Sequence, residues 1–234
     1  MFTGLVECVG AVKSITVESA DVRRIVIHAP AIARAMARGD SVAVSGVCLT
    51  VVESGRDVFQ AQIMEETLRT TKLGALSSDS RVNLERPALI GGRLDGHIVL
   101  GHVDGVGRMT KIENYGRTSM LRVSVPREIS WGIAARGSVS LDGVSLTVVD
   151  ASDEEFSVGL IPTTLQNTAL GSLSPGDPVN VEIDVIARYV AKLASSGMFP
   201  LLSGAAGVSG NLKKTEGDRL TWDKLEEYGW TQEG

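Results

Sequence analysis

The sequence predicts an all-β protein made of two tandem closed barrels, followed by one α-helix. Residues 41–85 and 138–182 align without gaps at an offset of 97 and share 19 of 45 residues, which indicates an internal repeat. Each copy holds about six short apolar or alternating runs and only two short helical segments, which favours a closed barrel over an α/β sheet. The 26 glycines and the 4% of aromatic residues suit short strands joined by tight turns.

The elements of the first copy follow from local signals. Residues 24–28 form a β-branched run that predicts a strand, and residues 30–39 predict a short helix that opens with proline and closes with glycine. Residues 42–52 predict a strand pair, residues 66–74 a second short helix and residues 82–85 a last strand. The second copy repeats this order at 121–125, 126–137, 139–149, 163–171 and 179–182, with the strand pairs turning at Gly46 and Gly143.

A helix is expected after the second copy only. In residues 184–194, Ile186, Val190 and Leu193 form an apolar stripe at helical spacing. Barrel closure does not need this helix, so we expect it to associate subunits, with a lid over one barrel as the alternative. The predicted domains are 1–97 and 98–183 for the barrels, 184–200 for the association helix and 201–234 for a linker and tail.

Composition excludes several classes of function. The net charge of −5 and the pI near 5.3 give no basic footprint for nucleic acid. No apolar run approaches the ~18 residues of a membrane span, and no signal-like segment opens the chain, so we expect a cytoplasmic protein. Cys8 and Cys48 are too few for a disulfide scaffold or a thiolate cage, and His97 and His102 lack a metal-ligand spacing. No glycine-rich phosphate motif is present, so we predict neither metal nor cofactor.

Positions where the two copies differ are the candidates for chemistry. The differing pairs are Cys48 and Ser145, Ser45 and Asp142, Gly39 and Arg136, and, in our alignment, Gly4 and His102. Thr50 and Thr147 keep a hydroxyl in both copies. Two such pockets would each bind one molecule of the same compound, and the two bound molecules would react differently. Taken singly, Cys48 is better explained as a small buried apolar residue, and the hydroxyl and histidine side chains are compatible with ordinary structural hydrogen bonds.

Several segments resemble the riboflavin synthase family of the alpha-chain type. They are the opening Met-Phe-Thr-Gly-Leu-Val-Glu, the pair Gly-Val-Cys-Leu-Thr (46–50) and Asp-Gly-Val-Ser-Leu-Thr (142–147), the junction Gly-His-Ile-Val-Leu-Gly-His (96–102), and Glu-Thr-Leu (66–68). The resemblance covers about residues 1–200. It implies Greek-key barrels in a homotrimer whose active site lies between the first barrel of one chain and the second barrel of a neighbour. It also implies lumazine synthase as a further partner.

The implied reaction is the dismutation of two molecules of 6,7-dimethyl-8-ribityllumazine. One molecule gives a four-carbon unit to the other, and the products are riboflavin and 5-amino-6-ribitylaminouracil. The reaction needs a base for the acidic C7 methyl group, for which His102 is a candidate, and a nucleophile at C7. Water, Cys48 and Ser145 all remain open as the source of that nucleophile.

Candidate site residues come from both copies. The predicted catalytic residues are Cys48, His102, Ser145 and Thr147. The predicted substrate contacts are Gly4, Leu5, Val6, Ser41, Cys48, Leu49, Thr50, Gln62, Ile63, Met64, Glu65, Glu66 and Thr67, together with His102, Val103, Asp104, Arg136, Asp142, Ser145, Leu146, Thr147, Leu160, Ile161, Pro162, Thr163, Thr164 and Leu165. Arg136 stands where the family usually has lysine. The positive charge is kept, but a compact ammonium is replaced by a planar guanidinium that can donate two parallel hydrogen bonds.

Three other functions compete with this interpretation. A lumazine-binding antenna protein would hold one ligand without turnover, and we would expect it to lose polar groups in one copy. A barrel pair that serves only assembly would leave the paired polar differences unexplained. A flavin-using reductase would need a nicotinamide-binding half, which the ~35 residues after the helix cannot form.

Overall fold

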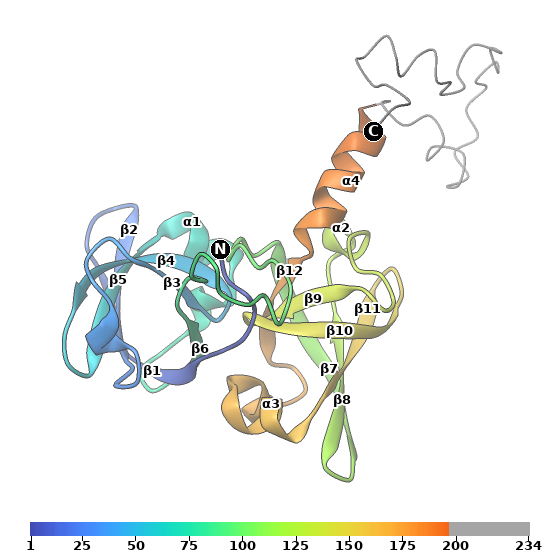
Figure 1. Ribbon diagram of the computed structural model, residues 1–234, viewed down its shortest axis with the longest axis horizontal. Coiled ribbons are helices and arrows are strands. Elements are labelled where there is room, and N and C mark those ends of the chain that lie inside the picture. Colours follow the sequence, from blue (N-terminus) through green and yellow to red (C-terminus); the bar gives the residue numbers. More distant parts are fainter. Residues whose placement is uncertain (197–234) are drawn as a thin grey trace, which may run out of the picture. The chain divides into compact units, whose positions relative to one another are not determined.

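The computed structural model describes residues 1–196 and contains two closed antiparallel barrels of six strands each (Figure 1). The strands of the first barrel are β1 (Cys8–Val17), β2 (Val22–His28), β3 (Ser41–Val44), β4 (Val47–Ser54), β5 (Val58–Met64) and β6 (Arg81–Glu85). Those of the second are β7 (Gly105–Tyr115), β8 (Thr118–Ser124), β9 (Ser138–Leu141), β10 (Val144–Ala151), β11 (Glu155–Leu160) and β12 (Pro178–Ile183). The predicted fold class is confirmed.

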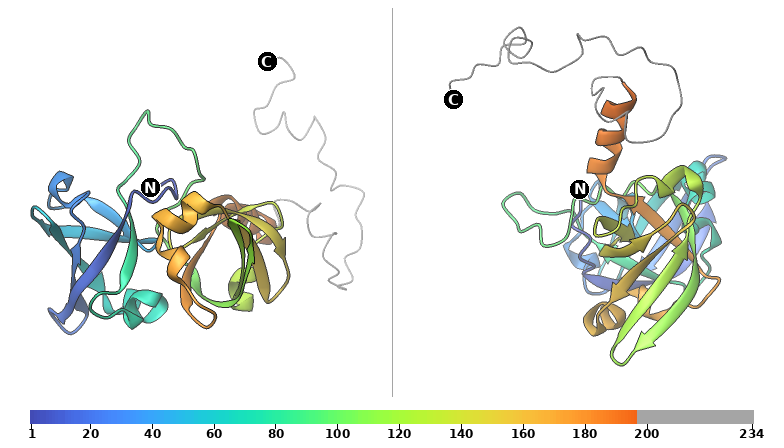
Figure 2. Two further views of the ribbon diagram at one scale, coloured as in Figure 1. Left: turned by 90° about the horizontal axis from the view of Figure 1, so that it is seen from below. Right: turned by 90° about the vertical axis from the view of Figure 1, so that its right-hand side faces the viewer.

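Both barrels have the same strand order. The first closes as β1-β2-β5-β4-β3-β6, and the second has the same circular order with β7 to β12 in the places of β1 to β6. Strands β2 and β3 are not neighbours, nor are β5 and β6, so these two connections pass across the barrel as in a Greek key. Figure 2 shows the two barrels as separate rings of strands, joined by a long loop between β6 and β7.

Each barrel encloses its own apolar core. Alternation along β2 turns Ile25 and Ile27 inward, where they are fully buried with Phe59 in the first core. Leu121 and Phe156 occupy the second core. The period-two pattern of the sequence therefore places one face of every strand pair inside a barrel.

The helices predicted over 30–39 and 126–137 are wrong in length. The structure has one 3-10 turn at η1 (Ala33–Ala35) and a single helical turn at α2 (Arg127–Ser130). Beyond these turns the backbone pairs with the barrel instead: the Gly39 N–H donates to the Val51 carbonyl at 2.9 Å, and the Arg136 N–H donates to Val148 at 2.8 Å. Those N–H groups are therefore not available for a longer helix.

The second helices lie where predicted, but each is divided in two. They are α1 (Glu65–Thr70) with η2 (Lys72–Ala75), and α3 (Pro162–Asn167) with η3 (Ala169–Ser172). Thr71 and Thr168 are extended, with φ of −127° in both, and each hydroxyl accepts the N–H two residues ahead. In each copy an extended threonine therefore ends the α-helix and caps the 3-10 turn that begins at residue 72 or residue 169.

Helix α4 (Val185–Ser195) confirms a helix after the second barrel. Its apolar residues Ile186, Tyr189 and Val190 are 62%, 66% and 49% exposed. The predicted helix end at 197–200 and the predicted tail over 201–234 lie outside the described residues. Across residues 1–196 no helix combines the length and apolar character that a membrane crossing requires.

Candidate active site

The segments before β1 and before β7, here called the two arms, each reach the other barrel. The Gly4 carbonyl accepts the Ser145 N–H of β10 at 2.8 Å, and the Gly101 carbonyl accepts the Cys48 N–H of β4 at 2.9 Å. Both glycines have positive φ, 77° and 78°, and a Cβ there would lie 2.5 Å from the Ser145 Cβ and 2.6 Å from the Cys48 Cβ. Only glycine permits this approach, so each arm lies directly against a predicted reactive residue.

This geometry corrects our alignment of Gly4 with His102. Gly4 corresponds to Gly101, at the same offset of 97 as the rest of the repeat, so the counterpart of His102 is Leu5. Val103, which follows His102, packs on the core of the first barrel, whereas Val6 packs on the core of the second. Residues on both sides of His102 therefore contact the first barrel, and its own side chain is exposed.

Two buried glutamates hold the arms. The Glu85 carboxylate accepts the Thr3 N–H at 2.6 Å, the Thr3 hydroxyl at 2.7 Å and the Gly4 N–H at 3.1 Å. The Glu182 carboxylate accepts the N–H groups of Leu100 and Gly101 at 2.7 and 3.0 Å. Burial raises the pKa of both carboxyls, although these hydrogen bonds oppose the rise. We did not predict either glutamate as functional. Their corresponding positions in the repeat were the sequence signal that could have identified them.

Ser145 of β10 and His97 form a hydrogen-bonded pair at the second barrel. The His97 Nδ1 lies 2.7 Å from the Ser145 Oγ, and His97 is 8% exposed. Within the described residues, its Nε2 is the buried side-chain atom without a hydrogen-bond partner. Burial lowers the pKa of His97, against the opposing charge of Asp184, so the neutral ring is favoured.

Cys48 is a free, half-buried thiol in the first barrel. Among residues 1–196 its thiol makes no side-chain hydrogen bond like the one that joins Ser145 to His97. The two candidate sites therefore differ by more than a thiol at one and a hydroxyl at the other. A group of three or more ligands able to hold a metal ion is not found among residues 1–196.

A row of polar side chains crosses the outer face of the first barrel beside Cys48. Ser41 on β3 pairs with Thr50 on β4, and Thr50 pairs with Gln62 on β5. In the second barrel Ser138 pairs with Thr147, but Gly159 stands where the first barrel has Gln62. Because residues opposite each other share a face, the structure brings these predicted contacts together and adds Ser138, which the sequence analysis missed.

Other predicted contacts flank these rows at both barrels. Met64 and Ile161 are corresponding apolar residues, 64% and 58% exposed, just before α1 and α3. The next predicted contacts lie in these two helices: Glu65, Glu66, Thr67, Pro162, Thr163, Thr164 and Leu165. An exposed apolar side chain beside polar ones suits a ring system with polar edges. Glu66 already binds Arg69 at 2.6 Å, which lowers the pKa of its carboxyl.

Some predicted contacts are not accessible as side chains. Leu49, Ile63, Leu146 and Leu160 are 5%, 1%, 9% and 1% exposed and belong to the barrel cores. Only their backbone could face a ligand.

The three predicted charged contacts of the second copy have different surroundings. Asp142 is fully buried and its carboxylate binds the Lys72 ammonium, so it belongs to the packing between barrels. Asp104 accepts the Ile183 N–H at 2.9 Å. Arg136 is exposed, with φ of 67°, just before β9, where its guanidinium is free to reach a ligand.

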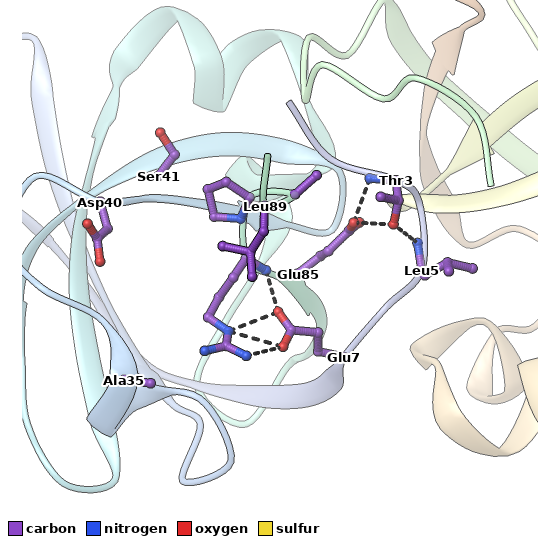
Figure 3. A pocket seen from close by; sticks show the side chains of 11 residues that line it. Thr3, Leu5, Glu7, Ala35, Asp40, Ser41, Glu85 and Leu89 are labelled. Carbon is purple, nitrogen blue, oxygen red and sulfur yellow. Dashed lines mark hydrogen bonds and ion pairs between the residues drawn. The ribbon is translucent and has the colours of Figure 1, made fainter. Parts of the chain in front are cut away.

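A cavity of about 500 Å³ opens beside the first arm (Figure 3). Two predicted contacts, Leu5 and Ser41, line it, and the Glu7–Arg86 ion pair, 2.6 Å between Nη2 and Oε2, forms part of its wall. Cys48 and Thr50 are not among its lining residues. The cavity therefore adjoins the polar row at its Ser41 end rather than enclosing the thiol.

Comparison with known proteins places these features in a family. A model of the lumazine binding domain matches residues 3–87 and again residues 100–184. The chain is 44% identical over 200 residues to the riboflavin synthase of Mycobacterium tuberculosis (strain ATCC 25618 / H37Rv), covering 84% of this chain and 99% of that protein. It is 41% identical over 190 residues to the riboflavin synthase of Actinobacillus pleuropneumoniae, covering 81% and 88%.

Solved structures with the same fold include two of LumP. LumP complexed with riboflavin matches with a TM-score of 0.71 at 29% identity, covering 78% of this chain and 99% of that chain. LumP complexed with 6,7-dimethyl-8-(1'-D-ribityl) lumazine matches with a TM-score of 0.70 at 27% identity, covering 78% and 98%.

Proposed function

Because this chain belongs to the riboflavin synthase family, we propose that it converts two molecules of 6,7-dimethyl-8-ribityllumazine into riboflavin and 5-amino-6-ribitylaminouracil. One substrate gives a four-carbon unit to the other, and the atoms of the two substrates equal those of the two products. The transfer is redox-neutral overall and needs no external oxidant or reductant.

The observation that carries this proposal is the difference between two otherwise corresponding candidate sites, one at each barrel. The second offers a hydroxyl hydrogen-bonded to a buried histidine, and the first offers a thiol without such a partner. A reaction in which two identical molecules take different roles requires sites that bind alike and react differently. Holding two rings in near-attack geometry can supply about 7–11 kcal/mol of the barrier.

Ser145 and His97 are the proposed acid–base pair. In the tautomer with the proton on Nε2, the His97 Nδ1 accepts the Ser145 hydroxyl proton at 2.7 Å. The neutral ring favoured by burial can take up that proton while Ser145 supplies, or orients through water, an oxygen nucleophile for C7. The other substrate must lose a proton from its C7 methyl group, and His102 and Cys48 are the proposed residues for that side.

The active assembly is proposed to be a homotrimer. Its support is the exposed apolar stripe of α4, with Ile186, Val190 and Leu193 at least 39% exposed, since such a stripe is typical of a helix that packs on another chain. In this arrangement the first pocket of one chain faces the second pocket of a neighbour, which brings the two substrates together.

A lumazine-binding protein without turnover is the second candidate, favoured by the similarity to LumP complexes. The retention of polar or reactive groups in both pockets argues against it, because a single-ligand binder needs only one such set.

One assay decides between them. The purified chain is incubated with 6,7-dimethyl-8-ribityllumazine alone, and riboflavin absorbance is followed while the substrate and uracil product are quantified. We expect two substrates consumed for each riboflavin and each uracil formed. Saturable binding with unchanged substrate would contradict the enzyme and support the binder.

A further inference from the structure

The face at which the two barrels meet is almost symmetric. The Asn83 amide donates to the Asp142 carbonyl at 2.9 Å, and the corresponding Asn180 amide donates to the Ser45 carbonyl at 2.8 Å. The amide oxygens of these asparagines accept the N–H groups of residues 169 and 72 at 2.7 and 2.8 Å. Each contact occurs twice with its partners exchanged by the offset of 97, so the barrels meet about an approximate two-fold axis.

Backbone contact on that axis is equally matched. Gly46 and Gly143 face each other so closely that a Cβ on either would lie 2.7 or 2.8 Å from the other's nitrogen. The arms also pair across it, since the Phe2 N–H donates to the Val99 carbonyl at 2.7 Å and the Val99 N–H donates back at 3.1 Å. On backbone geometry alone, either barrel face would fit a second copy of itself.

One buried ion pair breaks this symmetry. The Lys72 ammonium of the first barrel binds the Asp142 carboxylate of the second, and these side chains are 7% and 0% exposed. At the symmetry-related place stand Ala169 and Ser45, which carry no charge. Asp142 also accepts the Asn180 N–H at 2.9 Å, and Ser45 makes the corresponding contact with the Asn83 N–H at 3.3 Å. The Lys72 ammonium is therefore the group without an equivalent.

We propose that the Lys72–Asp142 pair makes this interface selective for one first barrel with one second barrel and rejects two copies of the same barrel. Two first barrels would bury two Lys72 ammoniums opposite Ser45, with no carboxylate for either. Two second barrels would bury two Asp142 carboxylates opposite Ala169. Burying an unpaired charge is strongly unfavourable, whereas a paired one is tolerated. The partner that the face accepts is thus set by charge rather than by shape.

We expect the Lys72–Asp142 pair to affect which barrel faces associate more than it affects the stability of the fold. Replacing both members of a buried ion pair by neutral residues is often neutral or stabilising, but removing one member leaves the other charge unpaired. The repeat itself supplies the replacement, because Ala169 and Ser45 already pack at the related place. Lys72→Ala combined with Asp142→Ser would therefore make the two faces nearly equivalent without leaving a buried charge. This inference does not depend on the proposed activity.

The test uses the full chain and four variants. They are Lys72→Ala, Asp142→Ser, their combination, and Glu66→Ser with Arg69→Ala, a control that removes the same kinds of charge from an exposed ion pair. Each protein is unfolded in denaturant and refolded over a range of concentrations. Sedimentation then measures the fraction in species heavier than the native assembly, and thermal unfolding is measured alongside.

We expect each single change to lower the unfolding midpoint more than the combination does, with a coupling that corresponds to about a tenfold or larger shift of the folding equilibrium. The combined variant should keep a midpoint near that of the unchanged chain, yet give heavy species that increase with concentration. The control should refold like the unchanged chain. If the combined variant refolds as cleanly as the unchanged chain, or is as unstable as the two single changes added together, the proposal is wrong.

Discussion

In the first barrel the Glu85 carboxylate holds the arm at Thr3 and Gly4, and in the second the Glu182 carboxylate holds the arm at Leu100 and Gly101. These framework contacts correspond at the offset of 97. The proposed reactive side chains differ: Cys48 corresponds to Ser145, and of these two only Ser145 is hydrogen-bonded to a histidine within residues 1–196. Contacts present in both copies fix the geometry, and we propose that contacts present in one copy carry the chemistry or the choice of partner.

The largest effect should come from the pair that only the second barrel has. Ser145→Ala and His97→Gln should each lower kcat by roughly 10²–10⁴-fold, because both remove the same acid–base function. The two changes together should cost little more than either alone, since the residues act as a unit. Steady-state and single-turnover rates of riboflavin formation measure this.

Ser124→Ala is the matched control, because it removes a hydroxyl from β8 of the same barrel outside the candidate site. It should keep the kcat of the unchanged chain. Fully multiplicative losses in the double variant would show that Ser145 and His97 act separately.

Helix α4 follows only the second barrel, and its removal should have the next largest effect. A chain that ends at Ile183 keeps all twelve strands but loses the exposed apolar stripe. If the active site spans two chains, the activity per chain should fall at least about tenfold when the protein is diluted about tenfold below its dissociation constant, as mass action requires. Sedimentation and activity over a concentration series measure both.

Removal of residues 204–234, which lie outside the described residues, is the companion truncation and should leave assembly and activity nearly unchanged. A chain without α4 that stays trimeric and fully active would exclude the helix from association.

The thiol of the first pocket should matter less than the serine–histidine pair of the second. Cys48→Ser makes the first pocket resemble the second and should keep lumazine binding while lowering kcat roughly tenfold, about 1.4 kcal/mol of transition-state stabilisation. The reciprocal change, Ser145→Cys, should lower kcat further, because it disturbs the hydroxyl paired with His97. Fluorescence titration gives the binding constant and turnover gives kcat.

His102→Gln tests the contribution of the second arm to the same difference between the two sites. It should lower kcat roughly tenfold with little change in binding, whereas Leu5→Gln at the corresponding position tests whether the arm only packs there. Equal losses in affinity and kcat for His102→Gln would make it a binding residue instead of a catalytic one.

The smallest predicted effect is on pH dependence. Burial lowers the pKa of His97 below its ordinary value of 6.5, so the neutral ring persists to lower pH than in an exposed histidine. The acid limb of kcat/KM attributed to this group should lie below pH 6.5. Because the unfolded chain protonates His97 first as pH falls, this residue also makes the fold less stable with decreasing pH.

The pH profile of His97→Gln checks both expectations. The variant should lose less unfolding free energy between about pH 7 and 5 than the unchanged chain. An equal loss in both proteins would assign the acid sensitivity to other groups.

Local patterns were enough to predict the framework. The repeat at an offset of 97 indicated two equivalent barrels, and alternation in segments such as 121–125 placed one face of each strand inside. The predicted helices at 30–39 and 126–137 were wrong in length because backbone N–H groups near their ends pair with β4 and β10. Proline and glycine at the ends of a segment do not indicate such pairing with a distant strand.

The sequence by itself determined the two barrels and the positions where the two copies differ, because periodicity and repetition act between residues close along the chain or at a fixed offset. Only the tertiary structure decided which reactive groups meet. His97 reaches Ser145 across 48 residues and Lys72 reaches Asp142 across 70. Such contacts depend on how the arms and barrels pack in space, and no local spacing encodes them. Burial then sets their chemistry, by favouring neutral His97 and by requiring that Lys72 and Asp142 stay paired.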